Sequence, residues 1–315
     1  MKLRTMAKTF SYVSVALVSI VTAMLIPATA YAAPNGYAAS DVLGQLTAGV
    51  PDLTTSNSGV TADHINYPSG AALDTVHHRL FVTDSSNNRV LVYSLDSHNN
   101  ITSHTASYVL GQPTFTSNLN TTTQAGVNSP YAGLAYDAVS DRLFVADSNN
   151  NRVLVYSLSG GITNGMNASN VLGQPNFTTS TGNLSQSGLN LPNGLAYDPV
   201  HQALYVADGN NIRVLMYDVA PSNITNGMNA SHVIGQPDFI TTGSFTTQAG
   251  LQHPIAITYN SVTQTLFVGD NNANRILTFD MTGSVTNGMN ASHVLCQPTF
   301  TSQNPPSGSP TASTT

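Results

Sequence analysis

The chain has little charge and almost no cysteine. Charged residues make up 8% of its 315 residues, and all fifteen acidic residues are aspartates, so glutamate is absent. Its one cysteine, Cys296, excludes an intramolecular disulfide, so packing must supply the stability. The sequence also lacks the basic stripe that binding to a phosphate backbone requires. We therefore expect no nucleic-acid partner.

Residues 1–32 have the pattern of a secretory signal. Three cations near the start precede an apolar run from Val13 to Ile26, and small residues follow as far as Ala32. We expect cleavage near Ala32, no membrane span in the mature chain, and a secreted, cell-surface or periplasmic location. The alternative is a retained membrane anchor, for which the apolar run is short.

A unit of about 62 residues recurs four times after this signal. Each copy contains an aspartate followed five residues later by an arginine, and the pairs are Asp84 with Arg89, Asp147 with Arg152, Asp208 with Arg213, and Asp270 with Arg275. A second marker, VLGQ or a close variant, ends at Gln45, Gln112, Gln174, Gln236 and Gln297. The second marker therefore has one copy more than the first.

Each unit reads as four short strands. In the second unit these are the segments 133–137 (GLAYD), 142–147 (RLFVAD), 152–158 (RVLVYSL) and 168–174 (ASNVLGQ). The links between them are short enough to join only antiparallel neighbours, and the strands are nearly continuous in apolar residues, so both faces of each sheet must be covered. Small sheets that cover one another in this way form a β-propeller, which is all-β.

Two segments carry a family resemblance, PNGLAYDPVHQALYVADGNNIRVLMYD (Pro192 to Asp218) and RLFVADSNNNRVLVYSL (Arg142 to Leu158). They resemble NHL repeats, and the chain as a whole is similar to exported NHL-repeat proteins of the bacterial type. The resemblance implies a propeller, commonly of six blades, that serves as a recognition platform. It also implies a second possibility, because some relatives are lyases or hydrolases with a metal in the central channel. The unit here is longer, because a polar connection of about twenty residues follows each VLGQ segment.

The expected organisation is a signal peptide (1–32), propeller repeats (33–301) and a disordered Pro/Ser/Thr-rich tail (302–315). Ala39 to Gln45 is expected to form an extra N-terminal strand, the fourth strand of a blade whose first three strands are missing. Three explanations remain open: a four-blade ring with a spare strand, a fragment of a longer array, or a ring shared by two chains. An open sheet edge predicts self-association.

The Asp-to-Arg turns have two interpretations. Oxygen-bearing residues at alternate positions after Asp84, Asp147 and Asp270 resemble a calcium loop, although Ile212 breaks this pattern in the third unit. The other interpretation is that each aspartate caps its turn and pairs with the following arginine, which fixes the hairpin. We prefer the structural pair, and we expect no cofactor, with calcium as the alternative.

The loop face of the propeller is the expected binding surface. In an antiparallel blade the long connections and the Asp-to-Arg turns emerge at the same end. A recurrent set of carboxamides lies there, two residues before each strand-leading proline: Asn66, Asn128, Asn190 and Gln252. They either satisfy buried backbone groups or, with His253, bind a polar ligand.

The sequence contains no converging set of catalytic or metal-ligating residues, and the histidines fall in loops and at variable strand positions. We therefore expect an exported, non-catalytic platform that binds a protein, peptide or polysaccharide through its loop face. The alternative is a metal-dependent lyase or lactone hydrolase with its site in the central channel.

Overall fold

The computed structural model describes residues 39, 41–54 and 56–303. The chain divides into two compact units, Met1–Ser40 and Asp41–Thr315, and the described blades all belong to the second. The predicted signal (1–32) lies outside the described residues. Of the predicted tail (302–315), only residues 302 and 303 are described.

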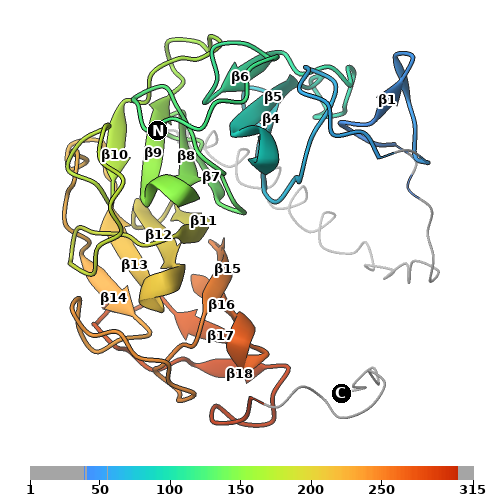
Figure 1. Ribbon diagram of the computed structural model, residues 1–315. Helices are drawn as coiled ribbons and strands as arrows, with labels where there is room; N and C mark the ends of the chain where they lie inside the picture. The colour runs from blue at the N-terminus through green and yellow to red at the C-terminus, as the bar shows by residue number, and fades with distance from the viewer. Residues whose placement is uncertain (1–38, 40, 55, 304–315) are drawn as a thin grey trace, which may run out of the picture. The chain divides into compact units, whose positions relative to one another are not determined.

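Four antiparallel four-stranded sheets, the blades, follow one another along the second unit (Figure 1). The first two blades are β3 (Ala71–Asp74), β4 (Arg79–Asp84), β5 (Arg89–Ser94) and β6 (Tyr108–Leu110), then β7 (Leu134–Asp137), β8 (Arg142–Asp147), β9 (Arg152–Ser157) and β10 (Asn170–Leu172). The last two blades are β11 (Pro192–Asp198), β12 (Ala203–Asp208), β13 (Arg213–Asp218) and β14 (His232–Ile234), then β15 (Pro254–Asn260), β16 (Thr265–Asp270), β17 (Arg275–Asp280) and β18 (His293–Leu295). The predicted all-β blade architecture is therefore confirmed.

A single 3-10 turn joins the second and third strands of every blade. These turns are η1 (Ser85–Asn87), η2 (Ser148–Asn150), η3 (Gly209–Asn211) and η4 (Asn271–Ala273). The residue after each turn adopts a left-handed conformation, with φ of 53° at Asn88 and 52° at Asn151. Asparagine tolerates this conformation better than most residues, which explains the asparagine-rich turn sequences. In the third blade Ile212 takes the same conformation, with φ of 56°.

The blades are held together by one apolar cluster at each junction. The cluster between the second and third blades contains Phe144, Val155, Leu204 and Leu215, all fully buried. Similar clusters join the first blade to the second and the third to the fourth. This arrangement explains why β8 and β12 are buried along their whole length, as the apolar runs in the sequence predict.

The fourth blade has one face that the described residues do not cover. Its strand β16 alternates between buried and half-buried residues, whereas the equivalent strand β12 is buried throughout. No strand pairing joins the first blade to the fourth in the described part of the chain.

The segment that precedes the first blade differs from its prediction. The predicted extra strand, Ala39 to Gln45, is not found in its described residues, 39 and 41–45, and the first strand pair is instead the small hairpin β1 (Leu46–Thr47) and β2 (Val50–Pro51). The VLGQ segment nevertheless keeps one contact of the other copies, because the Gly44 carbonyl accepts a hydrogen bond from Ile65 N at 3.3 Å. A strand requires a ladder partner, and the described residues supply none for Val42 and Leu43.

Candidate binding face

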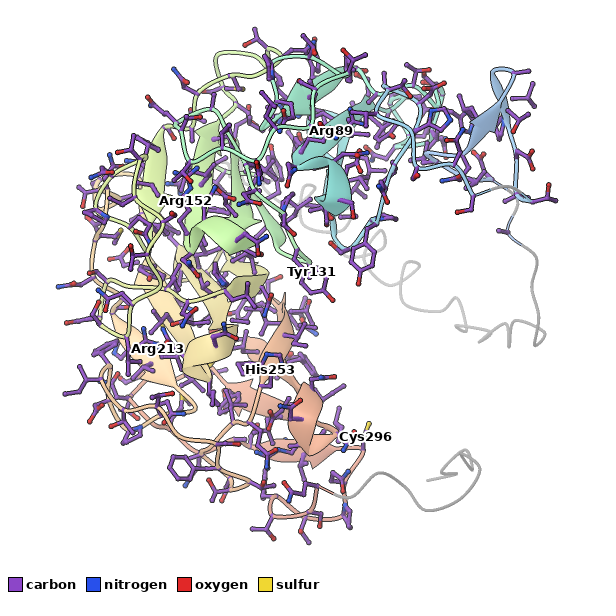
Figure 2. The ribbon with its side chains drawn as sticks, in the orientation of Figure 1. Arg89, Tyr131, Arg152, Arg213, His253 and Cys296 are labelled. Carbon is purple, nitrogen blue, oxygen red and sulfur yellow. The ribbon has the colours of Figure 1, made fainter. Side chains whose placement is uncertain are left out.

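The Asp-to-Arg turns are built around buried ion pairs. The distance from Arg89 Nε to Asp84 Oδ2 is 2.6 Å, and that from Arg152 Nε to Asp147 Oδ2 is 2.7 Å, with all four side chains fully buried. The pairs of the third and fourth blades measure 2.8 and 2.9 Å. Figure 2 labels three of these arginines, one in each of the first three blades.

Each buried arginine also connects its blade to the long loops. The Arg152 guanidinium donates to the carbonyl oxygens of Thr123, Gly126 and Phe177. Asp147 in turn accepts from the backbone N–H of Asn128 at 2.7 Å and from the side chain of Asn150. Protein donors therefore surround the carboxylate, and a guanidinium lies against it.

Burial in the blade changes the protonation of these carboxylates. Desolvation raises the pKa of Asp147 and of Asp208 to about 6, although Arg152 and Arg213 act in the opposite direction. At Asp137 the effect of hydrogen bonds on the pKa exceeds the effect of burial. Although burial opposes them, the Arg142 and Ser140 donors hold the pKa of Asp137 below its ordinary value.

The long connections and the 3-10 turns lie at the same end of the blades. The backbone N–H of Asn149, in η2, donates to the carbonyl of Asn128 in the long connection at 3.2 Å. The equivalent bond in the third blade joins Asn210 to Asn190 at 3.1 Å. This end, which we call the loop face, is therefore formed by all the elements that the sequence placed there.

The predicted carboxamides are half-buried and bond within their own blades. Asn149 Nδ2 donates to Asn128 Oδ1 at 3.4 Å, and Asn210 Nδ2 donates to Asn190 Oδ1 at 3.3 Å. The equivalent Gln252 bonds to Thr246 and Gln303 instead. Asn66 also precedes its blade at this end, where its backbone N–H donates to Asp84. In the second and third blades the half-buried asparagine thus pairs with an exposed asparagine of the 3-10 turn.

Aromatic side chains lie beside these carboxamides. The rings of Tyr67 and Tyr131 stack with centroids 6.1 Å apart and an interplanar angle of 23°, and Tyr67 is 58% exposed. Tyr131 also lines a pocket of about 480 Å³ with Ile255, Asn271 and Cys296. Figure 2 labels Tyr131 together with His253, which immediately precedes β15, and Cys296, which immediately follows β18. Sequence reasoning named His253 but missed Tyr131, because a single tyrosine in a varied position carries no repeat signal.

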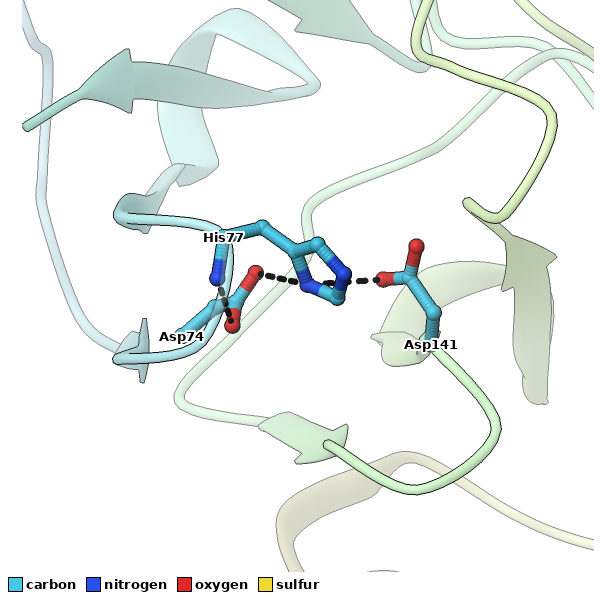
Figure 3. A group of neighbouring side chains, drawn as sticks. All are labelled: Asp74, His77 and Asp141. Atoms are coloured by element: carbon cyan, nitrogen blue, oxygen red, sulfur yellow. Dashed lines mark hydrogen bonds and ion pairs between the residues drawn. The ribbon is translucent and has the colours of Figure 1, made fainter.

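One group of metal-ligating type occurs in the described residues, at the opposite end of the first two blades. It consists of Asp74, His77 and Asp141 (Figure 3), with His77 Nδ1 3.1 Å from Asp74 Oδ2 and 3.8 Å from Asp141 Oδ1. Arg79 forms ion pairs with both aspartates. The positive charge that balances this cluster is thus a protein side chain, and the group connects the first blade to the second.

The repeated TNGMN sequences, which the sequence alone did not explain, connect neighbouring blades. Asn164 Oδ1 accepts from Val109 N of the preceding blade at 3.0 Å. Asn226 and Asn287 make the same bond to Val171 and Val233 at 3.0 and 3.1 Å. Each of these asparagines therefore fastens the outer strand of one blade to the next.

The family comparison agrees with this construction. The NHL repeat model matches residues 66–93 and 132–156, which correspond to the first three strands of each of the first two blades. The first two blades therefore contain NHL repeats. No curated protein matches this chain in sequence.

Many solved structures are similar to this chain, among them the following two. A chain of the nidogen/laminin complex is 19% identical with a TM-score of 0.45, over 75% of this chain and 65% of that chain. The structure of U3-55K is 10% identical with a TM-score of 0.43, over 69% of this chain and 50% of the other. The chain thus spans less than two thirds of the length of both. In the described part of the chain, no helix is long and apolar enough to cross a membrane.

Proposed function

We propose that the protein is an exported, non-catalytic binding platform whose loop face recognises a protein, peptide or polysaccharide. The observation that carries the proposal is the gathering of the long connections and the 3-10 turns at one end, joined by the hydrogen bonds of Asn128 and Asn190. Rigid blades position these segments, and irregular segments held on a rigid scaffold are a common place for recognition. Export rests on the pattern of residues 1–32.

The chemistry of the described residues supports binding over catalysis. The four strongly buried carboxylates of the turns are each paired with an arginine and have no free oxygen edge toward a substrate. The first strands of the blades bring aspartates to the opposite end, where Asp74 and Asp137 are bonded to Arg79 and Arg142. A lyase or hydrolase would require an acid, a base or metal ligands that converge on a substrate.

A matched pair of double variants tests the proposal. Asn149→Arg with Asn210→Arg places bulky charges on the loop face, where both side chains are exposed. Val139→Arg with Val262→Arg does the same at the opposite end, at positions 83% and 89% exposed. All are surface positions, so both variants should fold.

The mature chain and both variants would be screened against immobilised glycans and a peptide library. We expect the loop-face variant to lose binding that the opposite-end variant retains. Equal binding by all three chains, or loss only in the opposite-end variant, would contradict the proposal.

A further inference from the structure

Glycines mark the places where consecutive blades approach most closely near their inner strands. A Cβ atom at Gly70 would lie 2.7 Å from the carbonyl oxygen of Ala132 in the second blade. At Gly194 it would lie 2.5 Å from the carbonyl oxygen of Ile255 in the fourth blade. Gly133 meets the third blade in the same way. At all three junctions the backbone of the following blade lies so close that the position in the preceding blade must be a glycine.

A second glycine is required near the outer strand, in the VLGQ segment. Gly111 and Gly173 both have φ of 85°, and a Cβ atom there would lie 2.7 Å from Val127 and 2.5 Å from Leu189 of the following blade. Gly235 has φ of 91° and faces Leu251 in the same way. The apolar residue of the next blade thus occupies the space that a side chain would fill.

The fourth blade has lost both glycines. The register of β15 on β16 places Ala256 where the third blade has Gly194. Cys296 replaces the VLGQ glycine with φ of 68°, and its side chain is exposed. If a further blade packed on the fourth as the blades pack at the first three junctions, it would collide with the side chains of Ala256 and Cys296. The uncovered face of the fourth blade is therefore not shaped to receive another such repeat.

The pocket of about 480 Å³ lies on this uncovered face, at the end that belongs to the loop face. Tyr131 of the second blade forms one wall, Ile255 and Ile276 supply apolar surface, and Asn271 and Asn274 supply carboxamides. The charged residues of the lining, Asp270 and Arg275, are buried and paired with each other at 2.9 Å. A charged ligand would therefore find no free counter-charge there.

We propose that this pocket binds an uncharged oligosaccharide. A tyrosine ring and aliphatic side chains pack against the C–H faces of a sugar, and carboxamides both donate to and accept from its hydroxyl groups. The volume is within the range of small-ligand sites. The inference rests on the proposed function and specifies its ligand class and position.

The single cysteine of the chain provides a direct test, because Cys296 lines the pocket and its thiol is exposed. The rate of maleimide labelling of the native mature chain would be measured with cello-, xylo-, chito- and malto-oligosaccharides. An anionic galacturonate oligomer and an uncharged peptide serve as comparators. At a ligand concentration ten times the Kd, occupancy should slow labelling about tenfold.

Three variants assign the effect to the pocket. Tyr131→Ala should abolish the protection, and Tyr131→Phe should retain it because the ring remains. Tyr108→Ala, at an exposed position on β6, should have no effect. If Tyr131→Ala does not fold, Asn271→Ala takes its place, since this exposed turn residue lines the same pocket.

Protection by a neutral oligosaccharide that is lost in the pocket variants supports the inference. Protection by the peptide alone, by the anionic oligomer alone, or by raising the protein concentration alone would overturn it. Labelling that no ligand slows would also overturn it. The double variant at Asn149 and Asn210 reports separately on the proposed function, because neither residue lines the pocket.

Discussion

At the residue scale, the Asp–Arg pairs of the turns are ion pairs whose side chains are fully buried. Arg89, Arg152 and Arg213 are among its largest fully buried side chains. Burying one ion of a pair without its partner is costly, whereas the intact pair is roughly neutral compared with apolar residues of the same size. The pairs therefore specify the turn geometry and make single substitutions severe.

The first prediction concerns one such pair. Asp147→Ala leaves the Arg152 guanidinium buried without its carboxylate, and we expect a loss of about 3 to 5 kcal/mol in the free energy of unfolding. Chemical denaturation measures this loss, and Asp238→Ala at an exposed position is the control. The double variant Asp147→Ala with Arg152→Met should lose less than the single variant. An increase in the melting temperature of the wild type on adding calcium would contradict the pairing.

The second prediction concerns pH. Between the ordinary carboxyl pKa of 3.8 and about 6, the folded chain binds protons on Asp147 and Asp208 that the unfolded chain does not. Lowering the pH from about 7 to about 5 should therefore raise the free energy of unfolding. Asp74 and Asp137 have lowered pKa values, so their contribution is present above 3.8 and is lost as the pH falls through their folded pKa.

The two effects together predict a maximum of stability at moderately acid pH. Urea denaturation midpoints across this pH range would show it. A midpoint that falls steadily as the pH is lowered from neutral would contradict the raised pKa of the turn aspartates.

At the element scale, the VLGQ glycines decide how one blade receives the next. The third prediction is that Gly111→Ala costs about 1 to 3 kcal/mol of stability, because φ of 85° is strained for alanine and Val127 fills the space of the new methyl group. Gly160→Ala is the matched control, since no atom lies within 4 Å of its added Cβ atom. Thermal unfolding compares the two, and equal melting temperatures would contradict the close-approach argument.

Strands and turns were predictable from the sequence because their signals repeat. The apolar runs at 142–147 and 152–158 correspond to β8 and β9, since residues that are buried on both faces leave a continuous pattern. The segment 42–45 failed as a strand for a non-local reason. Its sequence matches the other VLGQ copies, but a strand depends on a neighbouring ladder that its own residues cannot provide.

The site was less predictable than the fold. The positions of Asn66, Asn128 and Asn190 follow from their recurrence, but their side-chain partners depend on distances between loops. The pocket beside Tyr131 is lined otherwise by residues of the fourth blade, and no sequence spacing encodes that proximity. Likewise the φ of 68° at Cys296, which is typical of glycine, is not encoded in its local sequence.

At the scale of the whole molecule, the two end blades differ in how they are covered. The described face of the fourth blade is unsuited to another repeat of the same register. Before the first blade, Val42 and Leu43 are not in a strand pairing, although Gly44 is bonded to Ile65. A backbone segment without a ladder partner is available to pair with another chain.

The fourth prediction is that the mature chain, residues 33–315, self-associates through this N-terminal edge. Removing residues 33–45 should change the association more than removing residues 302–315. Light scattering on the three chains measures it. A monomer in every case would mean that the edge is already satisfied.

The central claim is that one end of the blade array, the loop face, is the binding surface. Hydrogen–deuterium exchange with and without a ligand found in the binding screen tests it most directly. Binding should slow exchange in the long connections 113–128, 175–190 and 237–251 and in the 3-10 turns, and leave the opposite links 75–78, 138–141 and 199–202 unchanged. Protection confined to the opposite links would contradict the account.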